Sequence, residues 1–172
     1  VIHNSFLVIG FQELIDGTRG FINFPENLLY EEVPFLLPND KVIIEILETV
    51  EPSESIIAAC KNLKAKGYAL ALDDFIFHRD GYDPLIELAD IIKIEFANTA
   101  KQDQLEFLKK YKKEKILLAE KIETREEYQE AIQMGYSLFQ GYFFSKPLMV
   151  KSKELGHLDI NLIQVLKELH RE

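Results

Sequence analysis

The stretch Ala69-Leu-Ala-Leu-Asp73-Asp74 decides the fold of this chain, because an apolar strand that ends in two adjacent carboxylates is hard to explain by packing alone. Strand alternation places Asp73 on one face of a sheet and Asp74 on the other. The two carboxylates repel each other, and partial burial makes both charges costlier. One divalent cation, or a pair of them, would relieve that cost. The alternative interpretation is that one of the aspartates caps a loop or a helix.

Other apolar segments of the chain also end in a polar residue, and helix-forming segments separate them. Together with the aspartate pair, the strand-end residues are Asn23, Glu45, Asp73, Lys93, Glu120 and Gln140. The helix signals are equally clear. Pro52-Ser53 can begin one helix that Gly67 ends, and Thr124-Arg-Glu-Glu127 has the pattern of a capping box. This alternation of strands and helices predicts an α/β fold with a parallel sheet.

A polar group at the end of each strand favours a TIM-like (β/α) barrel, in which active-site groups lie at the carboxyl ends of the strands. A doubly wound open sheet is the structural alternative, although it has no need for a polar residue at every strand end. A complete barrel typically takes about 250 residues. This chain has 172 residues, so we expect a barrel that is incomplete at the N-terminus, with the first strand missing.

The two ends of the chain depart from this repeating pattern. Residues 1–14 have apolar side chains at helical spacing, with no cap before them. Near the other end, an amphipathic helix is predicted by Leu162, Val165, Leu166 and Leu169. We therefore expect a barrel domain over residues 1–150, followed over 151–172 by a linker and the first helix of a second domain.

Composition excludes several classes of protein. Hydrophobic residues make up 47% of the chain, which indicates a globular domain. With 20 basic and 29 acidic residues the net charge is −9, which argues against binding a nucleic-acid polymer. Cys60 is the single cysteine, as expected in a reducing compartment. No apolar run is long enough to cross a membrane, so the prediction is a cytoplasmic protein.

The strand-end residues suggest metal chemistry. Oxygen ligands are supplied by Asn23, Glu45, Asp73, Asp74 and Glu120. Such a set suits Mg²⁺, Mn²⁺ or Ca²⁺ better than zinc. Two ions of this kind could activate a water molecule and stabilise the oxygens of a phosphodiester. Lys93, held among carboxylates, would stay charged and orient the water or a phosphate, and this disfavours the alternative of a Schiff-base lysine in an aldolase-like barrel.

Several motifs, in order along the chain, resemble those of the EAL domain of bacterial cyclic-di-GMP signalling. They are Ile22-Asn23, Glu45-Ile-Leu-Glu48, Leu72-Asp73-Asp74-Phe75, Lys93-Ile-Glu95, Ala119-Glu120-Lys-Ile-Glu123, Gln140-Gly141-Tyr142 and Lys146-Pro147. The resemblance implies a modified TIM barrel and a metal-dependent phosphodiesterase that linearises cyclic-di-GMP. It implies Mg²⁺ or Mn²⁺ as cofactor, with Ca²⁺ as an inhibitor.

The resemblance also implies a role for each matching residue. Metal binding falls to Asn23, Glu45, Asp73 and Asp74. Glu120 and Lys93 match catalytic positions beside the metal-bound water, and Gln140 matches a residue near the substrate. Glu48 matches the glutamate that stabilises the loop after the aspartate pair.

The sequence departs from the family pattern at several positions. It contains no Glu-Ala-Leu signature, and the loop that normally reads DDFGTGYSS is here Asp73-Asp-Phe-Ile-Phe-His-Arg-Asp-Gly-Tyr82. Glu95 replaces the aspartate of KID, and Lys121 stands where AEGVE has glycine. Together with the helix from Leu158, these departures resemble EAL domains that are fused to an HDOD domain.

Two functional hypotheses follow from these departures and from the retained residues. The preferred one is a degenerate signalling module that binds nucleotide or a protein partner, with an HDOD domain or a second copy of the chain as predicted partners. The altered loop and the missing strand favour it. The alternative is an active phosphodiesterase, which the retained strand-end groups favour.

Overall fold

The computed structural model describes residues 18–31, 33–77 and 79–145. The predicted helices at residues 1–14 and after Leu158, and the Lys146-Pro147 motif, lie outside the described residues. The described strands and helices belong to one compact unit, Arg19–Pro147.

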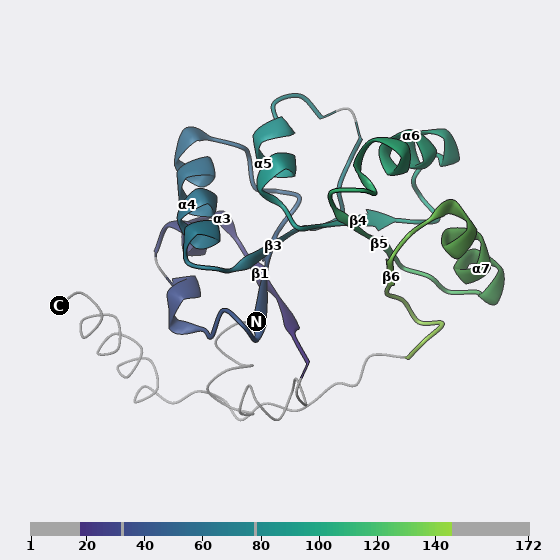
Figure 1. Ribbon diagram of the computed structural model, residues 1–172, viewed down its shortest axis with the longest axis horizontal. Coiled ribbons are helices and arrows are strands. Elements are labelled where there is room, and N and C mark those ends of the chain that lie inside the picture. Colours follow the sequence, from purple (N-terminus) through teal and green to yellow (C-terminus); the bar gives the residue numbers. More distant parts are fainter. Residues whose placement is uncertain (1–17, 32, 78, 146–172) are drawn as a thin grey trace. The chain divides into compact units, whose positions relative to one another are not determined.

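Six parallel strands form a single sheet in this unit (Figure 1). They are β1 (Gly20–Phe24), β2 (Val42–Ile46), β3 (Ala69–Leu72), β4 (Ile91–Glu95), β5 (Ile116–Glu120) and β6 (Leu138–Phe139). Each strand pairs with the next one along the chain, so the order is β1-β2-β3-β4-β5-β6. A doubly wound sheet reverses its strand order at a switch point. The observed order has no reversal and confirms the barrel-type α/β fold.

The helices between the strands are α3 (Glu26–Tyr30), α4 (Glu54–Ala65), α5 (Asp83–Leu88), α6 (Lys101–Tyr111) and α7 (Arg125–Met134), with a 3₁₀ turn, η1 (Val33–Leu36). Two predicted caps are confirmed. Ser53 accepts a hydrogen bond from the Ile56 N–H at the start of α4, and Thr124 and Glu127 form the capping box of α7. Helix α6 begins at Lys101 without a side-chain cap.

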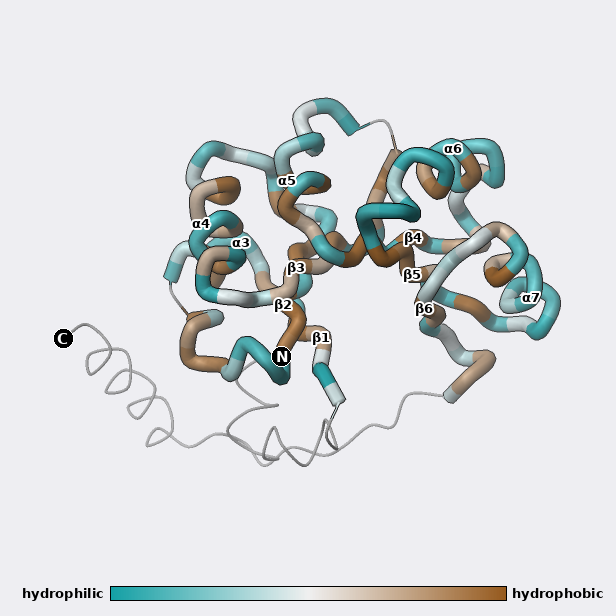
Figure 2. Tube along the Cα trace, viewed as in Figure 1, coloured by the Kyte–Doolittle hydropathy of each residue, from teal (hydrophilic) through white to brown (hydrophobic). Residues whose placement is uncertain are grey.

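The sheet has two different faces. The face toward the helices is apolar, with fully buried side chains such as Ile44, Leu70 and Ile92. In Figure 2 the strands are mostly brown, and the helices alternate between brown and teal as expected for amphipathic helices. The other, inner face has a small apolar cluster formed by Ile43, Ala71, Ile91 and Leu118, against which Phe21 and Ala69 pack. All of these helices therefore line one side of a curved sheet, which is the wall of a barrel.

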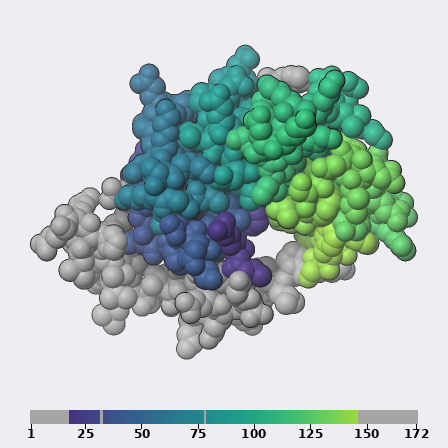
Figure 3. All heavy atoms as spheres, viewed as in Figure 1, coloured from purple at the N-terminus to yellow at the C-terminus, as the bar shows by residue number. Residues whose placement is uncertain are grey.

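Within the described residues this wall is not closed. β1 pairs with β2, and β6 pairs with β5, so neither edge of the sheet has a second partner there. Figure 3 shows an open space between the purple residues of β1 and the yellow-green segment after β6. The six strands thus form a half-barrel. None of the described helices is long and apolar enough to cross a membrane.

Candidate functional site

The predicted site residues lie at the carboxyl ends of the strands, on the inner face of the sheet. Four of them each follow a member of the inner apolar cluster by two positions, which keeps them on the same face. They are Glu45 after Ile43, Asp73 after Ala71, Lys93 after Ile91 and Glu120 after Leu118. Asn23 lies beside Glu45 in the register of β1 and β2. Parallel pairing therefore brings together residues that are far apart in the sequence.

Lys93 lies at the centre of the first group of charges, which we call the inner centre: Lys93, Glu45, Asp73 and Glu120. Its Nζ atom lies 2.7 Å from Asp73 Oδ1 and 2.7 Å from Glu120 Oε1, and it also donates a hydrogen bond to Glu45 Oε1. The Lys93 side chain is only 5% exposed, and those of Glu45 and Glu120 are each 6% exposed. The inner centre is thus one ammonium among three carboxylates, nearly removed from solvent.

Burial decides the electrostatics of the inner centre. It raises the pKa of Glu45 to about 7, although the hydrogen bond and the charge of Lys93 oppose the shift. Burial also raises the pKa of Glu120, again against the effect of Lys93. For Lys93 itself, burial lowers the pKa, but hydrogen bonds to the three carboxylates outweigh it and the net shift is upward. Hydrogen bonding therefore favours the ammonium form of Lys93, which is one positive charge among three carboxylates.

A second group of charges lies at the rim of the same site; we call it the outer centre: Lys121, Asp74 and Glu95. Lys121 Nζ lies 3.2 Å from Asp74 Oδ1 and 3.0 Å from Glu95 Oε2. The Lys121 side chain is 49% exposed, so this centre is in contact with solvent. Hydrogen bonding to Lys121 lowers the pKa of Glu95.

The two adjacent aspartates are thus divided between the two centres. The Asp73 N–H donates a hydrogen bond to the Ile46 carbonyl and the Phe75 N–H donates to the Lys93 carbonyl, so the chain stays anchored on both sides of Asp74. Between these anchors, Asp74 adopts a left-handed conformation with φ of 39°. Aspartate is one of the few non-glycine residues that tolerate this region. The turn sends Asp73 to the inner centre and Asp74 to the outer one.

The inner centre has the ligands that a hard divalent cation requires. One oxygen from each of Glu45, Asp73 and Glu120 lies within 4.8 Å of the others. Oxygens bound to one Ca²⁺ are each 2.3–2.6 Å from it, which is about half that separation. Glu120 Oε2 is buried, and in the described part of the chain no hydrogen bond reaches it. A buried carboxylate oxygen without a partner is costly, and the three carboxylates therefore fit a metal ion.

The loop after β3 is held by packing and by Arg79. Phe75 and Phe77 pack against Phe107 of α6, with ring centroids 5.2 and 5.1 Å from it. Arg79 donates a hydrogen bond of 2.5 Å to the Glu48 carbonyl and forms an ion pair of 2.5 Å with Glu51. Phe75, Phe77 and Arg79 thus anchor this loop to α6 and to the loop after β2. Glu48, predicted to stabilise the loop through its side chain, is exposed and contacts Arg79 through its backbone.

Gln140 lies at the end of β6, next to β5. Its N–H donates a hydrogen bond of 2.9 Å to the Ala119 carbonyl, and its side chain is exposed. The next residue, Gly141, passes so close to the neighbouring segment that a Cβ would lie 2.1 Å from the Ile122 carbonyl oxygen. Only glycine fits there, and Gln140 directly precedes this close approach.

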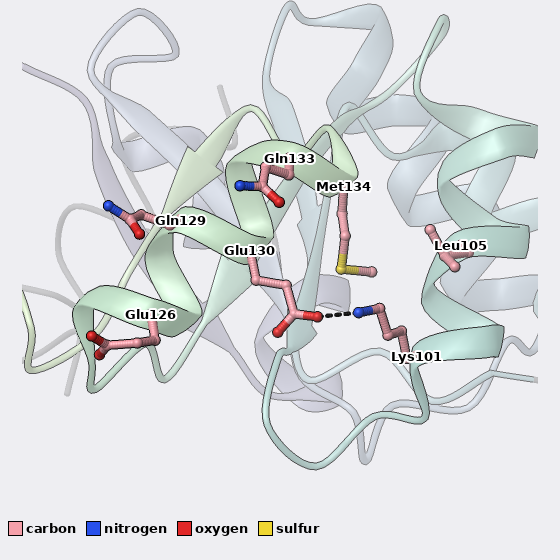
Figure 4. Close-up of a pocket in the computed structure, with 7 residues that line it drawn as sticks. All are labelled: Lys101, Leu105, Glu126, Gln129, Glu130, Gln133 and Met134. Atoms are coloured by element: carbon pink, nitrogen blue, oxygen red, sulfur yellow. Dashed lines mark hydrogen bonds and ion pairs between the residues drawn. The ribbon is translucent and has the colours of Figure 1, made fainter.

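A groove elsewhere on the surface lacks the buried charges of the inner centre. It lies between α6 and α7, and Figure 4 shows its lining residues Lys101, Leu105, Glu126, Gln129, Glu130, Gln133 and Met134. Lys101 and Glu130 form an ion pair across it. Lys101 and Glu130 are exposed and already paired, so the carboxyl ends of the strands remain the candidate site.

Two residues of the site, Glu95 and Lys121, were not among the predicted site residues. Both were recognised in the sequence as departures from the family pattern, but neither was given a role. A signal was present, because Glu95 ends a strand and Lys121 directly follows Glu120. Sequence alternation alone could not show that the two side chains meet Asp74.

Comparison with known proteins identifies relatives of this chain. The EAL domain family model matches residues 18–147. The chain is 40% identical to the uncharacterized protein YuxH of Bacillus subtilis, over 100% of this chain and 43% of that protein. It is 33% identical to the cyclic di-GMP phosphodiesterase CdgJ of Vibrio cholerae, over 98% of this chain and 40% of that protein. The chain therefore spans less than half the length of these curated relatives.

A solved structure agrees with these matches. The complex of Klebsiella pneumoniae BlrP1 with calcium and cyclic-di-GMP is similar to this chain, with a TM-score of 0.67 and 26% identity. The similarity covers 82% of this chain and 42% of that one.

Proposed function

The chain belongs to the EAL domain family, and from this membership and the geometry of the site we propose that it binds cyclic-di-GMP together with a divalent cation and hydrolyses it only weakly. The observation that carries this proposal is the inner centre, in which Glu45, Asp73 and Glu120 converge on one point and a buried Glu120 oxygen has no hydrogen-bond partner within the described residues. Such a site attracts a hard cation, and a bound cation reverses the local field so that a phosphate can approach.

The residues of the site would divide the work of binding. Glu45, Asp73 and Glu120 would hold the cation, and Asn23, adjacent to Glu45, has an amide oxygen for the same purpose. Mg²⁺ or Mn²⁺ would supply Lewis-acid stabilisation of a phosphodiester and lower the pKa of water. Lys93 stays charged and can donate hydrogen bonds to a phosphate oxygen or to water. Asp74 belongs to the outer centre, and Gln140 lies where its amide could contact a nucleotide at the rim.

Weak turnover is supported by the loop after β3. Phe75, Phe77 and Arg79 hold this loop against α6 and the loop after β2. A loop with these contacts cannot close over a substrate without losing them. Since small errors in the placement of reacting groups cost orders of magnitude in rate, an anchored loop favours binding over catalysis.

An active phosphodiesterase is the second candidate function. Two observations favour it: the inner centre retains its lysine and all three carboxylates, and the 33% identical relative CdgJ is named a cyclic di-GMP phosphodiesterase. Ca²⁺, present in the BlrP1 complex, would then act as an inhibitor that occupies the site without supporting catalysis.

The predicted partners are part of the same proposal. A module that binds nucleotide without hydrolysing it transmits its signal through a protein partner. The candidate partners are an HDOD domain, another protein and a second copy of this chain. The proposal includes no nucleic-acid polymer, because the net charge of −9 repels phosphate backbones. A cytoplasmic location follows from the single cysteine, Cys60, which suits a reducing compartment.

The test is a calorimetric titration with cyclic-di-GMP in Mg²⁺, beside a hydrolysis assay in excess Mg²⁺ or Mn²⁺. Asp73→Asn removes one carboxylate of the inner centre, and Asp40→Asn changes an exposed aspartate outside it as the matched control. We expect binding that Asp73→Asn weakens and Asp40→Asn leaves unchanged, with little product. Turnover near one per second, which is in the ordinary enzymatic range of about 1–10³ s⁻¹, and abolished by Asp73→Asn would establish the second candidate. Absence of binding would overturn both.

A further inference from the structure

Lys121 has an unusual backbone conformation for a lysine. Its φ is 57°, in the left-handed region that L side chains rarely adopt. Glycine is the residue that takes this conformation without strain, and glycine is the residue that the AEGVE pattern has at this place. Local backbone preference therefore does not explain a lysine here, and an explanation must come from what its side chain contacts.

The Lys121 ammonium contacts two carboxylates that would otherwise face each other. Its Nζ lies within 3.2 Å of an oxygen of Asp74 and 3.0 Å from an oxygen of Glu95. A lysine is ordinarily protonated at neutral pH, so both carboxylates face a positive charge. The outer centre is thus a cation held between two carboxylates, next to the aspartate of the inner centre.

The inner centre, by contrast, retains an unused ligand. Glu120 is 4% exposed, and its Oε2 atom has no hydrogen-bond partner among the residues described. Asp74 Oδ1 likewise has no hydrogen bond within the described residues, but it lies 3.2 Å from the Lys121 ammonium, so in the outer centre the chain itself supplies a positive charge to this oxygen.

We propose that the Lys121 ammonium takes the place of a second metal ion, so that this site binds one divalent cation where the carboxylates alone would accept two. The inference rests on the proposed function only in requiring that the inner centre binds a cation. A tethered ammonium satisfies Asp74 and Glu95 with no loss of a free ion's entropy. The positive charge of Lys121 also repels a second divalent ion. Paired metal ions lie about 3.5–4 Å apart and share ligands, so a second ion would have to bind close to Lys121.

The test measures the stoichiometry of Mn²⁺, without nucleotide and without an activity assay. Lys121→Met removes the charge and keeps the length of the side chain, whereas Lys121→Arg keeps the charge and is the matched control. Calorimetry counts the ions, and electron paramagnetic resonance distinguishes an isolated Mn²⁺ from an exchange-coupled pair. We expect one isolated ion in the wild type and in Lys121→Arg, and a coupled pair in Lys121→Met.

The outcomes separate this inference from the proposed function. Two coupled ions in the wild type would overturn the role of Lys121 and leave the metal site of the proposed function intact. One ion in Lys121→Met would also overturn it, because the second place would then be closed for another reason. No bound ion in any of the three proteins would overturn the proposed metal site itself.

Discussion

The inner and outer centres have the same chemistry and opposite surroundings. Each consists of a lysine bonded to carboxylates from neighbouring strand ends, and each receives one member of the aspartate pair. Lys93 is 5% exposed, however, and Lys121 is 49% exposed. Burial strengthens the attraction within an ion pair but raises the cost of any charge left unpaired, whereas water screens an exposed pair. Burial therefore determines how strongly the stability of the fold depends on each lysine.

The largest expected difference comes from removing each lysine in turn. Lys93→Met leaves buried carboxylates without a cation and should lower the free energy of unfolding by about 3–5 kcal/mol. Lys121→Met, which breaks exposed pairs, should lower it by less than about 1 kcal/mol. Urea unfolding followed by circular dichroism, at neutral pH and without metal, measures both. Equal losses in the two variants would show that burial does not distinguish the centres.

The two centres should also respond to pH in opposite directions. In the folded chain the pKa of Glu45 is raised from 4.5 to about 7, so folding takes up a proton between these values. The contribution of Glu45 to stability is therefore fully present below pH 4.5 and lost as the pH rises through about 7. The pKa of Glu95 is lowered, so its contribution is present above the ordinary pKa of a glutamate and lost as the pH falls.

Two variants separate these contributions. Glu45→Gln should remove a pH dependence of at most about 1.4 kcal/mol per pH unit. Glu95→Gln should remove a smaller pH dependence of opposite sign. It amounts to less than about 1 kcal/mol in total, because the ion pair of Glu95 is exposed. Unfolding free energies measured at a series of pH values test both. The assignment fails if Glu45→Gln keeps the wild-type dependence near neutral pH.

A further effect concerns the loop that carries Asp74 to the outer centre. Arg79→Ala removes the hydrogen bond to the Glu48 carbonyl and the contact with the Tyr82 ring, 4.2 Å from the guanidinium carbon. We expect a loss of about 1 kcal/mol and faster amide exchange in this loop, with the strands of the inner centre unchanged. Arg19→Ala, which removes a hydrogen bond of 3.2 Å to the Asp40 carbonyl, is the control. Equal exchange in both variants would mean that Arg79 does not hold the loop.

Much of the fold follows from local patterns that can be seen in the sequence. Strands β2, β4 and β5 each coincide with an apolar run in the sequence, because parallel strands that are buried on both faces are apolar on both faces. The α7 cap was predicted because a capping box depends only on residues within one helical turn. The end of β6 at Phe139 is not such a local property, since it comes just before the close approach of Gly141 to Ile122.

The amino-acid sequence by itself determined the elements, their parallel order and the face on which Glu45, Asp73, Lys93 and Glu120 lie, because strand alternation and hydrophobic periodicity are local properties. Tertiary structure alone decided which carboxylate meets which lysine. The left-handed backbone of Asp74 and Lys121 turns two neighbouring acids toward different cations. Such a division depends on distances between side chains from different strands, and these exist only once the sheet has formed.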